Sequence, residues 1–211
     1  MDEPVFRRLR EEDAEAVAAL FRDTFGADRP LDAEEIIWWF ENEAFDTEQM
    51  RVLEVDGRIV GYGDLWPLAH DMALDVAAPG HWDTFVDWAE SSGRERQLER
   101  VRLNFPPGHE LEELARRRGY RLWRSGYTME LAFTGPPPAG SLPHGFELRT
   151  YRPEDEERVR STVNEAFASD PTFEPATSSE FREFFLGGRG FDPQLWLLAW
   201  ELEELAGCAL A

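Results

Sequence analysis

Val55-Asp-Gly-Arg-Ile-Val-Gly-Tyr-Gly63 is the stretch that decides the fold, because it encodes the tight turn of a β-hairpin. An Asp-Gly pair suits a two-residue type I′ turn, in which both central residues take positive φ. The apolar residues on either side of this pair predict strands over residues 51–55 and 59–65. The middle of the chain's first half is therefore expected to be an antiparallel sheet.

Helical patterns precede this hairpin. Apolar residues recur at helical spacing over residues 12–25, which predicts a helix with one apolar face. A second helix is predicted over residues 31–45, where Asp32 is a plausible N-cap and Glu35 completes a capping box. A short strand over residues 5–9 comes before both helices.

Strands and helices alternate after the hairpin, up to a proline-rich stretch. The expected elements are a strand over 72–76, a helix over 82–90, a strand over 101–104, a helix over 109–118 and a strand pair over 120–124 and 127–133. The whole order predicts an α/β (α+β) fold with a mixed, mostly antiparallel sheet flanked by helices.

An internal repeat follows the first set of elements. At an offset of 142, residues 6–28 and 148–170 are identical at eight of 23 positions. At an offset of 145, residues 49–55 match residues 194–200. We therefore expect the second half of the chain to repeat the first half of the fold as far as the hairpin.

The predicted organisation is one complete copy plus the N-terminal half of a second. Residues 1–134 form the first domain, residues 135–145 a linker rich in proline and glycine, and residues 146–211 the incomplete second domain. The part that would complete the second copy lies beyond the equivalent of Leu65, and a longer natural chain would carry it.

Three motifs in this order resemble the GCN5-related N-acetyltransferase (GNAT) family. They are Arg8-Leu-Arg-x-x-Asp13 before the first helix, the hairpin of residues 55–63, and Asn104 followed by Leu114-Ala-x-x-x-Gly-Tyr120. The repeated start is similar to that of tandem members of this family. The resemblance implies transfer of an acyl group from acetyl-CoA, as co-substrate, to the amine of a small molecule.

The resemblance also implies where the cofactor lies. In this family the sheet splays after the fourth strand, the pantetheine lies in the gap, and the pyrophosphate sits on backbone amides where the next helix begins. The residues expected at the cofactor are Val76, Ala77, Ala78, Gly80, His81, Trp82 and Asn104. This loop lacks the basic residue and the second glycine of the family pattern, and Ala115 stands where the family has a tyrosine acid. The first copy is therefore expected to be catalytically degenerate.

Candidates for the other roles come from the same comparison. Asp71 and Asp75, at the fourth strand, are candidates for the general base that deprotonates the amine, the alternative being surface carboxylates. Trp38 and Trp39, on the second helix, are candidates for a cation–π wall beside the amine, the alternative being packing on the sheet.

Composition excludes several function classes. The formal charge is −21, from 43 acidic and 22 basic residues, and such a chain is repelled by nucleic acid and by anionic membranes. One cysteine and four scattered histidines give no metal-ligand pattern. The sequence shows no signal peptide and no apolar stretch of about 18 residues, so a cytoplasmic location is expected.

Three function classes stay open at this point. The leading one is a GNAT-type acyltransferase of which this chain alone is inactive. The others are a non-catalytic module that binds CoA or another ligand, and a structural interaction domain. The strand edge that an incomplete second sheet leaves unpaired predicts a homodimer through that edge.

Overall fold

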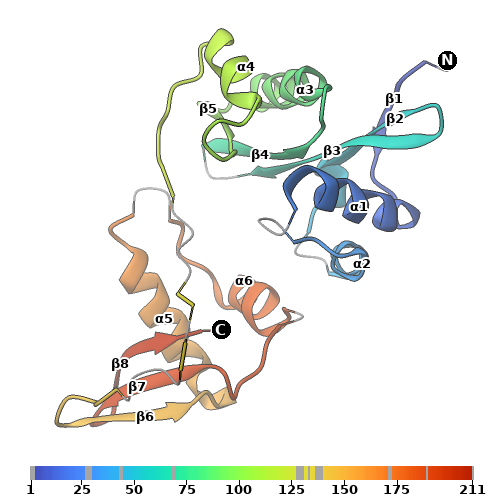
Figure 1. Cartoon of the computed structure of the whole chain (residues 1–211). Coiled ribbons are helices and arrows are strands. Elements are labelled where there is room, and N and C mark those ends of the chain that lie inside the picture. The colour runs from blue at the N-terminus through green and yellow to red at the C-terminus, as the bar shows by residue number, and fades with distance from the viewer. Residues whose placement is uncertain are drawn as a thin grey trace. The chain divides into compact units, whose positions relative to one another are not determined.

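The computed structural model describes residues 3–26, 30–42, 45–67, 70–126, 131–132, 134–135, 140–170, 173–188 and 190–210. The chain divides after Ser125 into two compact units, an N-terminal unit and a C-terminal unit, and each has its own sheet and apolar core (Figure 1). The linker predicted at residues 135–145 lies C-terminal to this division, and the predicted domain limits stay a prediction.

The sheet of the N-terminal unit has five strands in the order β1-β2-β3-β4-β5. Neighbours from β1 to β4 pair antiparallel, and β5 joins β4 in parallel. The strands are β1 (Val5–Arg8), β2 (Met50–Val55), β3 (Arg58–Pro67), β4 (Asp71–Ala77) and β5 (Arg100–Leu103). The predicted mixed, mostly antiparallel sheet is confirmed.

Helices cover both faces of this sheet, as Figure 1 shows. α1 (Ala14–Phe25) and α2 (Ala33–Glu41) pack on the face that carries Tyr62, whereas α3 (Trp82–Glu95) and α4 (Leu111–Arg117) pack on the face that carries Val76. Two short 3-10 turns, η1 (Glu11–Asp13) and η2 (Thr47–Gln49), precede α1 and β2. None of the helices in the described ranges is long and apolar enough to cross a membrane.

The local sequence signals explain these elements. Asp56 and Gly57 have φ of 50° and 74°, as a type I′ turn requires. Asp32 caps α2, since its side chain accepts a 2.7 Å hydrogen bond from the Glu35 amide. The predicted extension of this helix to residue 45 is wrong, because the backbone at Asn42 is already extended.

The strand predicted over residues 120–124 is also wrong. No strand forms among residues 118–126, and residues 127–130 and 133 of its predicted partner lie outside the described residues. Leu122 is 86% exposed, and the ring of Trp123 lies 4.2 Å from the guanidinium carbon of Arg102. A cation–π contact with β5 therefore takes the place of the expected ladder.

The C-terminal unit repeats the strand, 3-10 turn, two helical segments and strand pair of the first part of the N-terminal unit, except that its second helical segment runs on into a π-helical turn. Its three strands pair antiparallel in the order β6-β7-β8, and its helices pack on one face of them. The elements are β6 (Phe146–Thr150), η3 (Pro153–Asp155), α5 (Glu156–Phe167), α6 (Ser178–Phe181), the π-helical turn η4 (Arg182–Leu186), β7 (Leu197–Glu201) and β8 (Glu204–Ala209). That this unit is a second GNAT copy stays a prediction.

Strand pairing fixes the alignment of the two units. Arg7 of β1 pairs with Val52 of β2, and Arg149 of β6 pairs with Leu198 of β7. The sequence offset between the units is therefore 142 from β1 to β6 and 146 from β2 to β7. The predicted offset of 145 is therefore wrong by one residue. Because side chains alternate between faces along a strand, that one residue decides which face each side chain takes.

Candidate active site

The sheet opens between β4 and β5. Their parallel pairing runs from Asp71–Arg100 to Leu74–Leu103, where β5 ends, whereas β4 continues to Ala77. The last three residues of β4 therefore have no pairing on the β5 side among the described residues. This is the place where the family resemblance predicts the pantetheine.

The loop after β4 has the backbone expected of a phosphate-binding turn. Val76, Ala77 and Ala78 are buried, and the amide of His81 donates a 2.8 Å hydrogen bond to the Ala78 carbonyl oxygen. Gly80 lies in this turn with φ of 74°, a conformation that favours glycine. The turn leads directly into the N-terminus of α3, where helix amides favour an anion.

Aromatic side chains span the gap that the strands leave. We call Trp82, Phe105, His109 and Phe25 the aromatic bridge. The ring centroids of Trp82 and His109 lie 5.0 Å apart in an edge-to-face arrangement, and those of Phe25 and Phe105 each lie 6.2 Å from that of His109. Trp82 follows β4 and His109 follows β5, so their contact joins the two sides of the opening.

The aromatic bridge decides how well the site fits acyl-CoA. The backbone at Gly80 and the start of α3 fit the phosphates, but rings in van der Waals contact leave no path for a pantetheine between them. Asn104 lies exposed just after β5, and Ala115, at the family's acid position, is buried in α4. The aromatic bridge and Ala115 thus depart from the CoA site that the family resemblance predicts, whereas the backbone at Gly80 agrees with it.

Asp71, one of the two candidate bases, is an ion-pair partner. It is 3% exposed, its Oδ1 accepts a 2.8 Å hydrogen bond from Nε of Arg100, and its Oδ2 accepts one from Arg102. Burial opposes ionisation of this carboxyl, but the hydrogen bonds from the two arginines outweigh it and lower its pKa. A carboxylate held in this way is a weak proton acceptor.

Asp75, the other candidate base, lies opposite a second carboxylate. Its partner across β3 and β4 is Asp64, which is 6% exposed. Both carboxylates share the α1 and α2 face with Tyr62, two residues before Asp64. Burial, and then the charges of Asp64 and Asp75, raise the pKa of Tyr62 well above its usual range. Two carboxylates beside a neutral phenol form a region that attracts a cation.

Aromatic rings surround this carboxylate pair. Nε1 of Trp66 donates a 2.7 Å hydrogen bond to Oδ2 of Asp64, and Trp66 is 37% exposed. The ring of Phe45 lies 5.7 Å from that of Trp66 and 5.0 Å from that of Trp38. Trp39 is a buried core ring that stacks on Phe45 and on Tyr62.

The structure therefore brings some of the predicted residues together and separates others. Asp75 shares a face with the predicted Trp38 and Trp39, but the exposed ring that is hydrogen-bonded to Asp64 is Trp66. Asp64, Trp66 and Tyr62 are absent from the sequence prediction. The sequence signal for them was a carboxylate, Asp64, within the otherwise apolar strand of residues 59–65.

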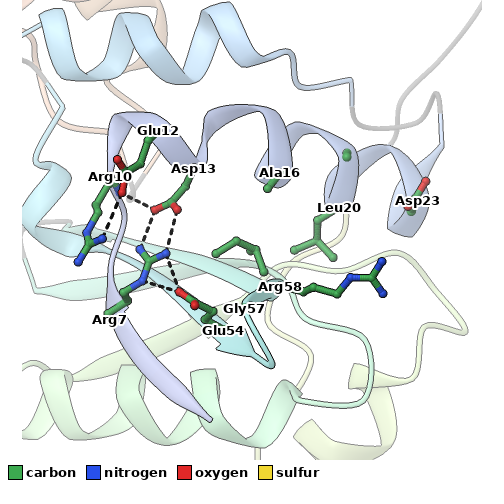
Figure 2. Close-up of a pocket in the computed structure, with 12 residues that line it drawn as sticks. Arg7, Arg10, Glu12, Asp13, Ala16, Leu20, Asp23, Glu54, Gly57 and Arg58 are labelled. Atoms are coloured by element: carbon green, nitrogen blue, oxygen red, sulfur yellow. Dashed lines mark hydrogen bonds and ion pairs between the residues drawn. The ribbon is translucent and has the colours of Figure 1, made fainter. Parts of the chain in front are cut away.

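A hollow lies elsewhere, between α1 and the turn of the β2–β3 hairpin (Figure 2). Its volume is about 730 Å³. At its base Arg7 donates hydrogen bonds of 2.7 and 2.9 Å to the two carboxylate oxygens of Asp13, and one of 3.0 Å to Glu54. The charged groups at the base of this hollow are thus paired with one another.

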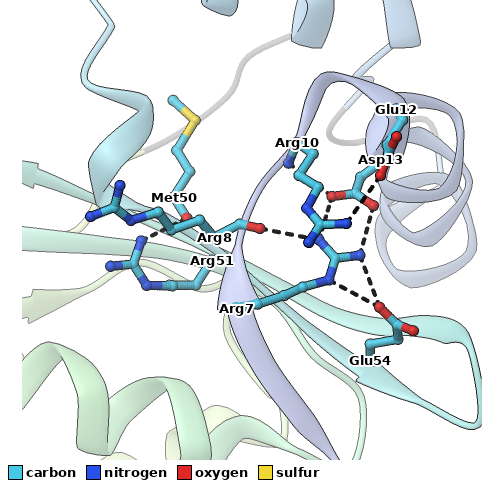
Figure 3. Close-up of polar contacts among 8 residues, drawn as sticks. All are labelled: Arg7, Arg8, Arg10, Glu12, Asp13, Met50, Arg51 and Glu54. Carbon is cyan, nitrogen blue, oxygen red and sulfur yellow. Dashed lines mark hydrogen bonds and ion pairs between the residues drawn. The ribbon is translucent and has the colours of Figure 1, made fainter.

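Figure 3 shows what this network does for the fold. Asp13 also accepts a 2.8 Å hydrogen bond from the Arg10 amide, which ties the start of α1 to β1. Burial opposes ionisation of Asp13, yet the bonds from Arg7 and Arg10 lower its pKa. In the C-terminal unit Arg149 bonds Asp155 in the same way, at 2.5 and 2.7 Å. An equivalent arginine–aspartate ion pair therefore stabilises each unit internally.

Comparison with known proteins relates the chain to acetyltransferases by sequence and by fold. No family model matches the chain. It is 37% identical over 98 residues to the mycothiol acetyltransferase of Geodermatophilus obscurus, an alignment that covers 45% of this chain and 32% of that protein. The chain thus spans about a third of the length of this curated relative.

The structural match covers the whole chain. A GCN5-related N-acetyltransferase from Sphaerobacter thermophilus superposes with a TM-score of 0.79 at 24% identity, over 100% of this chain and 72% of that one. At this identity the match shows the fold. The predicted fold class is therefore confirmed.

Proposed function

We propose, for a chain whose fold is that of the GCN5-related N-acetyltransferases, that it works in the transfer of an acyl group from acyl-CoA to the amine of a small molecule. In this proposal the N-terminal unit binds the amine and does not itself perform the transfer. Acetyl-CoA is the proposed acyl donor for the complete reaction, and the cytoplasm is the proposed location.

The observation that carries the proposal is the pairing of Asp64 with Asp75 across β3 and β4. Two facing carboxylates attract an alkylammonium ion, whose three N–H groups can donate to carboxylate oxygens. Trp66 supplies an exposed indole face beside them, where a cation is further stabilised. Asp75, the less buried of the two, is the proposed proton acceptor for the bound ammonium.

Two features described above support the proposed absence of transfer by this unit. In this proposal the rings of Trp82 and His109, which are in contact, obstruct the path of the pantetheine. The buried methyl group of Ala115 offers no proton to a departing thiolate. Both features would have to change before this unit could complete a transfer.

A second candidate function is a structural interaction domain that binds neither CoA nor amine. The ion-pair joint that recurs as Arg7–Asp13 and Arg149–Asp155 favours it, because it stabilises both units without serving a ligand. Amine binding is the property that separates the two candidates.

Calorimetry with butylamine and ethanolamine, and with butanol as the uncharged control, tests the proposal on the full chain. We expect saturable binding of the amines alone. Asp75→Asn should weaken it about tenfold, the effect of losing one charge-assisted contact. Asp23→Asn, which changes an exposed carboxylate on α1, is the matched control. No amine binding by the unaltered chain would leave the structural candidate.

Thiol release from acetyl-CoA tests the proposal that the N-terminal unit does not itself perform the transfer. The unaltered chain should release none above the buffer rate with any of these amines, and release would contradict the non-transferring role. The double variant Trp82→Leu, His109→Ser removes two rings of the aromatic bridge and keeps an acceptor for the Leu111 amide, which His109 now serves. This variant should gain measurable CoA binding, whereas Trp123→Ala should not.

A further inference from the structure

A second pocket of the N-terminal unit lies where α3 and α4 end and β5 begins. Its volume is about 650 Å³, within the range of roughly 300–1,000 Å³ that small-molecule sites occupy. Of the chain's 22 basic residues five line this pocket, against one of its 43 acidic residues. They are Arg94, Arg100, Arg102, Arg118 and Arg121, with Glu90. We call it the arginine pocket.

The arginine pocket is separate from the turn at Gly80. α3 begins at Trp82, directly after that turn, and its last turn carries Arg94, which lines the pocket. The 14 residues of α3 span about 20 Å. β5 likewise begins at Arg100, in the pocket, and ends at Leu103, where the sheet opens. A ligand of the pocket would therefore lie at the opposite end of α3 from the predicted phosphate position.

Ion pairs hold several of these guanidinium groups in place. Asp71, which is 3% exposed and does not line the pocket, bonds both Arg100 and Arg102. Carboxylates of α3 hold Arg118 in the same way. A guanidinium has five N–H donors, and the ion pairs within the described residues use at most three on any of these arginines. Positioned donors thus remain for an anion.

Arg121 and Trp123 add an unpaired cation and an aromatic surface. Arg121 is exposed and makes no ion pair with any of the residues that the structure describes. Trp123 is 51% exposed, and the guanidinium carbons of Arg102 and Arg100 lie 4.2 and 5.9 Å from its ring centroid. An indole that carries a guanidinium on one face can stack an aromatic ring on the other.

The adjoining sequence supplies little charge to neutralise these arginines. Residues 126–145, which follow the pocket in the chain, include a single acidic residue, Glu130. A ligand that brings its own negative charge would complete the set, since guanidinium groups bind phosphate and carboxylate groups bidentately.

We propose that the arginine pocket binds a small aromatic anion, whose ring stacks on Trp123 and whose phosphate or carboxylate group accepts hydrogen bonds from Arg121 and Arg100. The site is a binding site without chemistry of its own. The inference depends neither on the proposed amine site nor on acyl transfer.

Calorimetry with phenyl phosphate tests the proposal on the full chain. We expect saturable binding with a Kd on the order of 0.1–1 mM. Inorganic phosphate and phenol each carry half of the recognised chemistry, and each should bind at least about tenfold more weakly. Benzoate is the carboxylate probe, and the tighter of the two aromatic anions identifies the anionic group. Hydrogen exchange should slow in β5 and over residues 118–123.

Three variants locate the binding. Arg121→Gln removes an exposed arginine without an ion pair, so it should weaken phenyl phosphate binding about tenfold and leave the unfolding midpoint unchanged. Trp123→Ala should weaken phenyl phosphate binding about tenfold and leave inorganic phosphate unaffected. Arg117→Gln is the matched control, because Arg117 is an exposed arginine at the end of α4 outside the pocket.

Several results would overturn the proposal. One is the absence of saturable binding of either aromatic anion up to about 10 mM. Another is equal weakening by Arg117→Gln, which would indicate general attraction to positive charge. Inorganic phosphate that binds as tightly as phenyl phosphate would remove the aromatic part of the ligand. Slowed exchange at the start of α3 instead of in β5 would place the anion at the Gly80 turn.

Discussion

Arg149 places its guanidinium carbon 4.3 Å from the ring centroid of Trp200, at the position where Arg7 of the N-terminal unit binds the carboxylate of Glu54. Strand pairing makes Glu54 and Trp200 equivalent at the offset of 146. Arg7 thus contacts two carboxylates, whereas the equivalent Arg149 contacts one carboxylate and an aromatic face. The two units use equivalent arginines with different second partners.

This difference predicts unequal effects of removing the shared carboxylate. Asp13→Asn leaves Arg7 bonded to Glu54 and should lower the free energy of unfolding by about 1–2 kcal/mol. Asp155→Asn leaves Arg149 on an uncharged ring, and the cost should reach about 3 kcal/mol because Asp155 is fully buried. Hydrogen exchange of α1 and of α5 measures each unit separately. Glu154→Gln, at an exposed neighbour, is the control, and equal effects of the two Asp variants would contradict the prediction.

The same carboxylates predict a loss of stability in acid. Asp13, Asp71 and Asp155 have pKa values lowered by their arginines, so the stability they contribute is present above the unfolded value of 3.8. It is lost as the pH falls below about 4 and through the lowered values. Urea midpoints between pH 6 and pH 2.5 should fall steeply in that window. Arg149→Met should flatten the decline for the C-terminal unit, and an unchanged profile in this variant would rule out the assigned cause.

Asp71 should act in stability and not in ligand binding. Asp71→Asn leaves Arg100 and Arg102 with one weaker acceptor, and the N-terminal unit should lose about 2 kcal/mol of unfolding free energy. Amine binding by this variant should equal that of the unaltered chain, in contrast with Asp75→Asn. Thermal unfolding and calorimetry on the same sample check both statements. Loss of amine binding without loss of stability would return Asp71 to the role of base.

The two sheet glycines should respond oppositely to a methyl group. Gly61→Ala forces a Cβ against the Phe85 ring, and this overpacking should cost about 1–3 kcal/mol. Gly207→Ala meets open space and should be neutral or slightly stabilising, because alanine loses less backbone entropy than glycine. Urea unfolding of the two single variants compares them directly. A large destabilisation by Gly207→Ala would contradict the open space around Gly207.

The order of elements could be predicted because short-range signals fix it. Asp56-Gly57 sets the turn and Asp32 sets a helix start, and both depend only on neighbouring residues. The alignment of the second strand was missed by one residue, because three leucines and two tryptophans in residues 195–200 fit either face equally well by pattern. Only pairing with β6, far away in sequence, distinguishes them.

The site was harder to predict than the fold, because it depends on pairing between residues that are far apart in sequence. Asp75 and Asp71 are equivalent in sequence, each an acidic residue in an apolar strand. What separates them is the neighbour across the sheet, which is Asp64 for one and Arg100 for the other. The strand pair expected from Tyr120 onward was inferred from local pattern alone, and the cation–π contact of Trp123 with Arg102 on β5 has no sequence signature.

The β-bulge that falls between Leu53 and Glu54, and again between Ala199 and Trp200, has a consequence for recombination. With equal turn lengths and equally placed bulges, residues 50–63 and 196–209 are interchangeable cassettes. A chimera that exchanges them as whole blocks keeps every side chain on its original face. If residues 196–209 were inserted one residue out of step, the core ring of Trp200 would turn toward solvent. Chimeras can therefore locate the boundary of each block to a single residue.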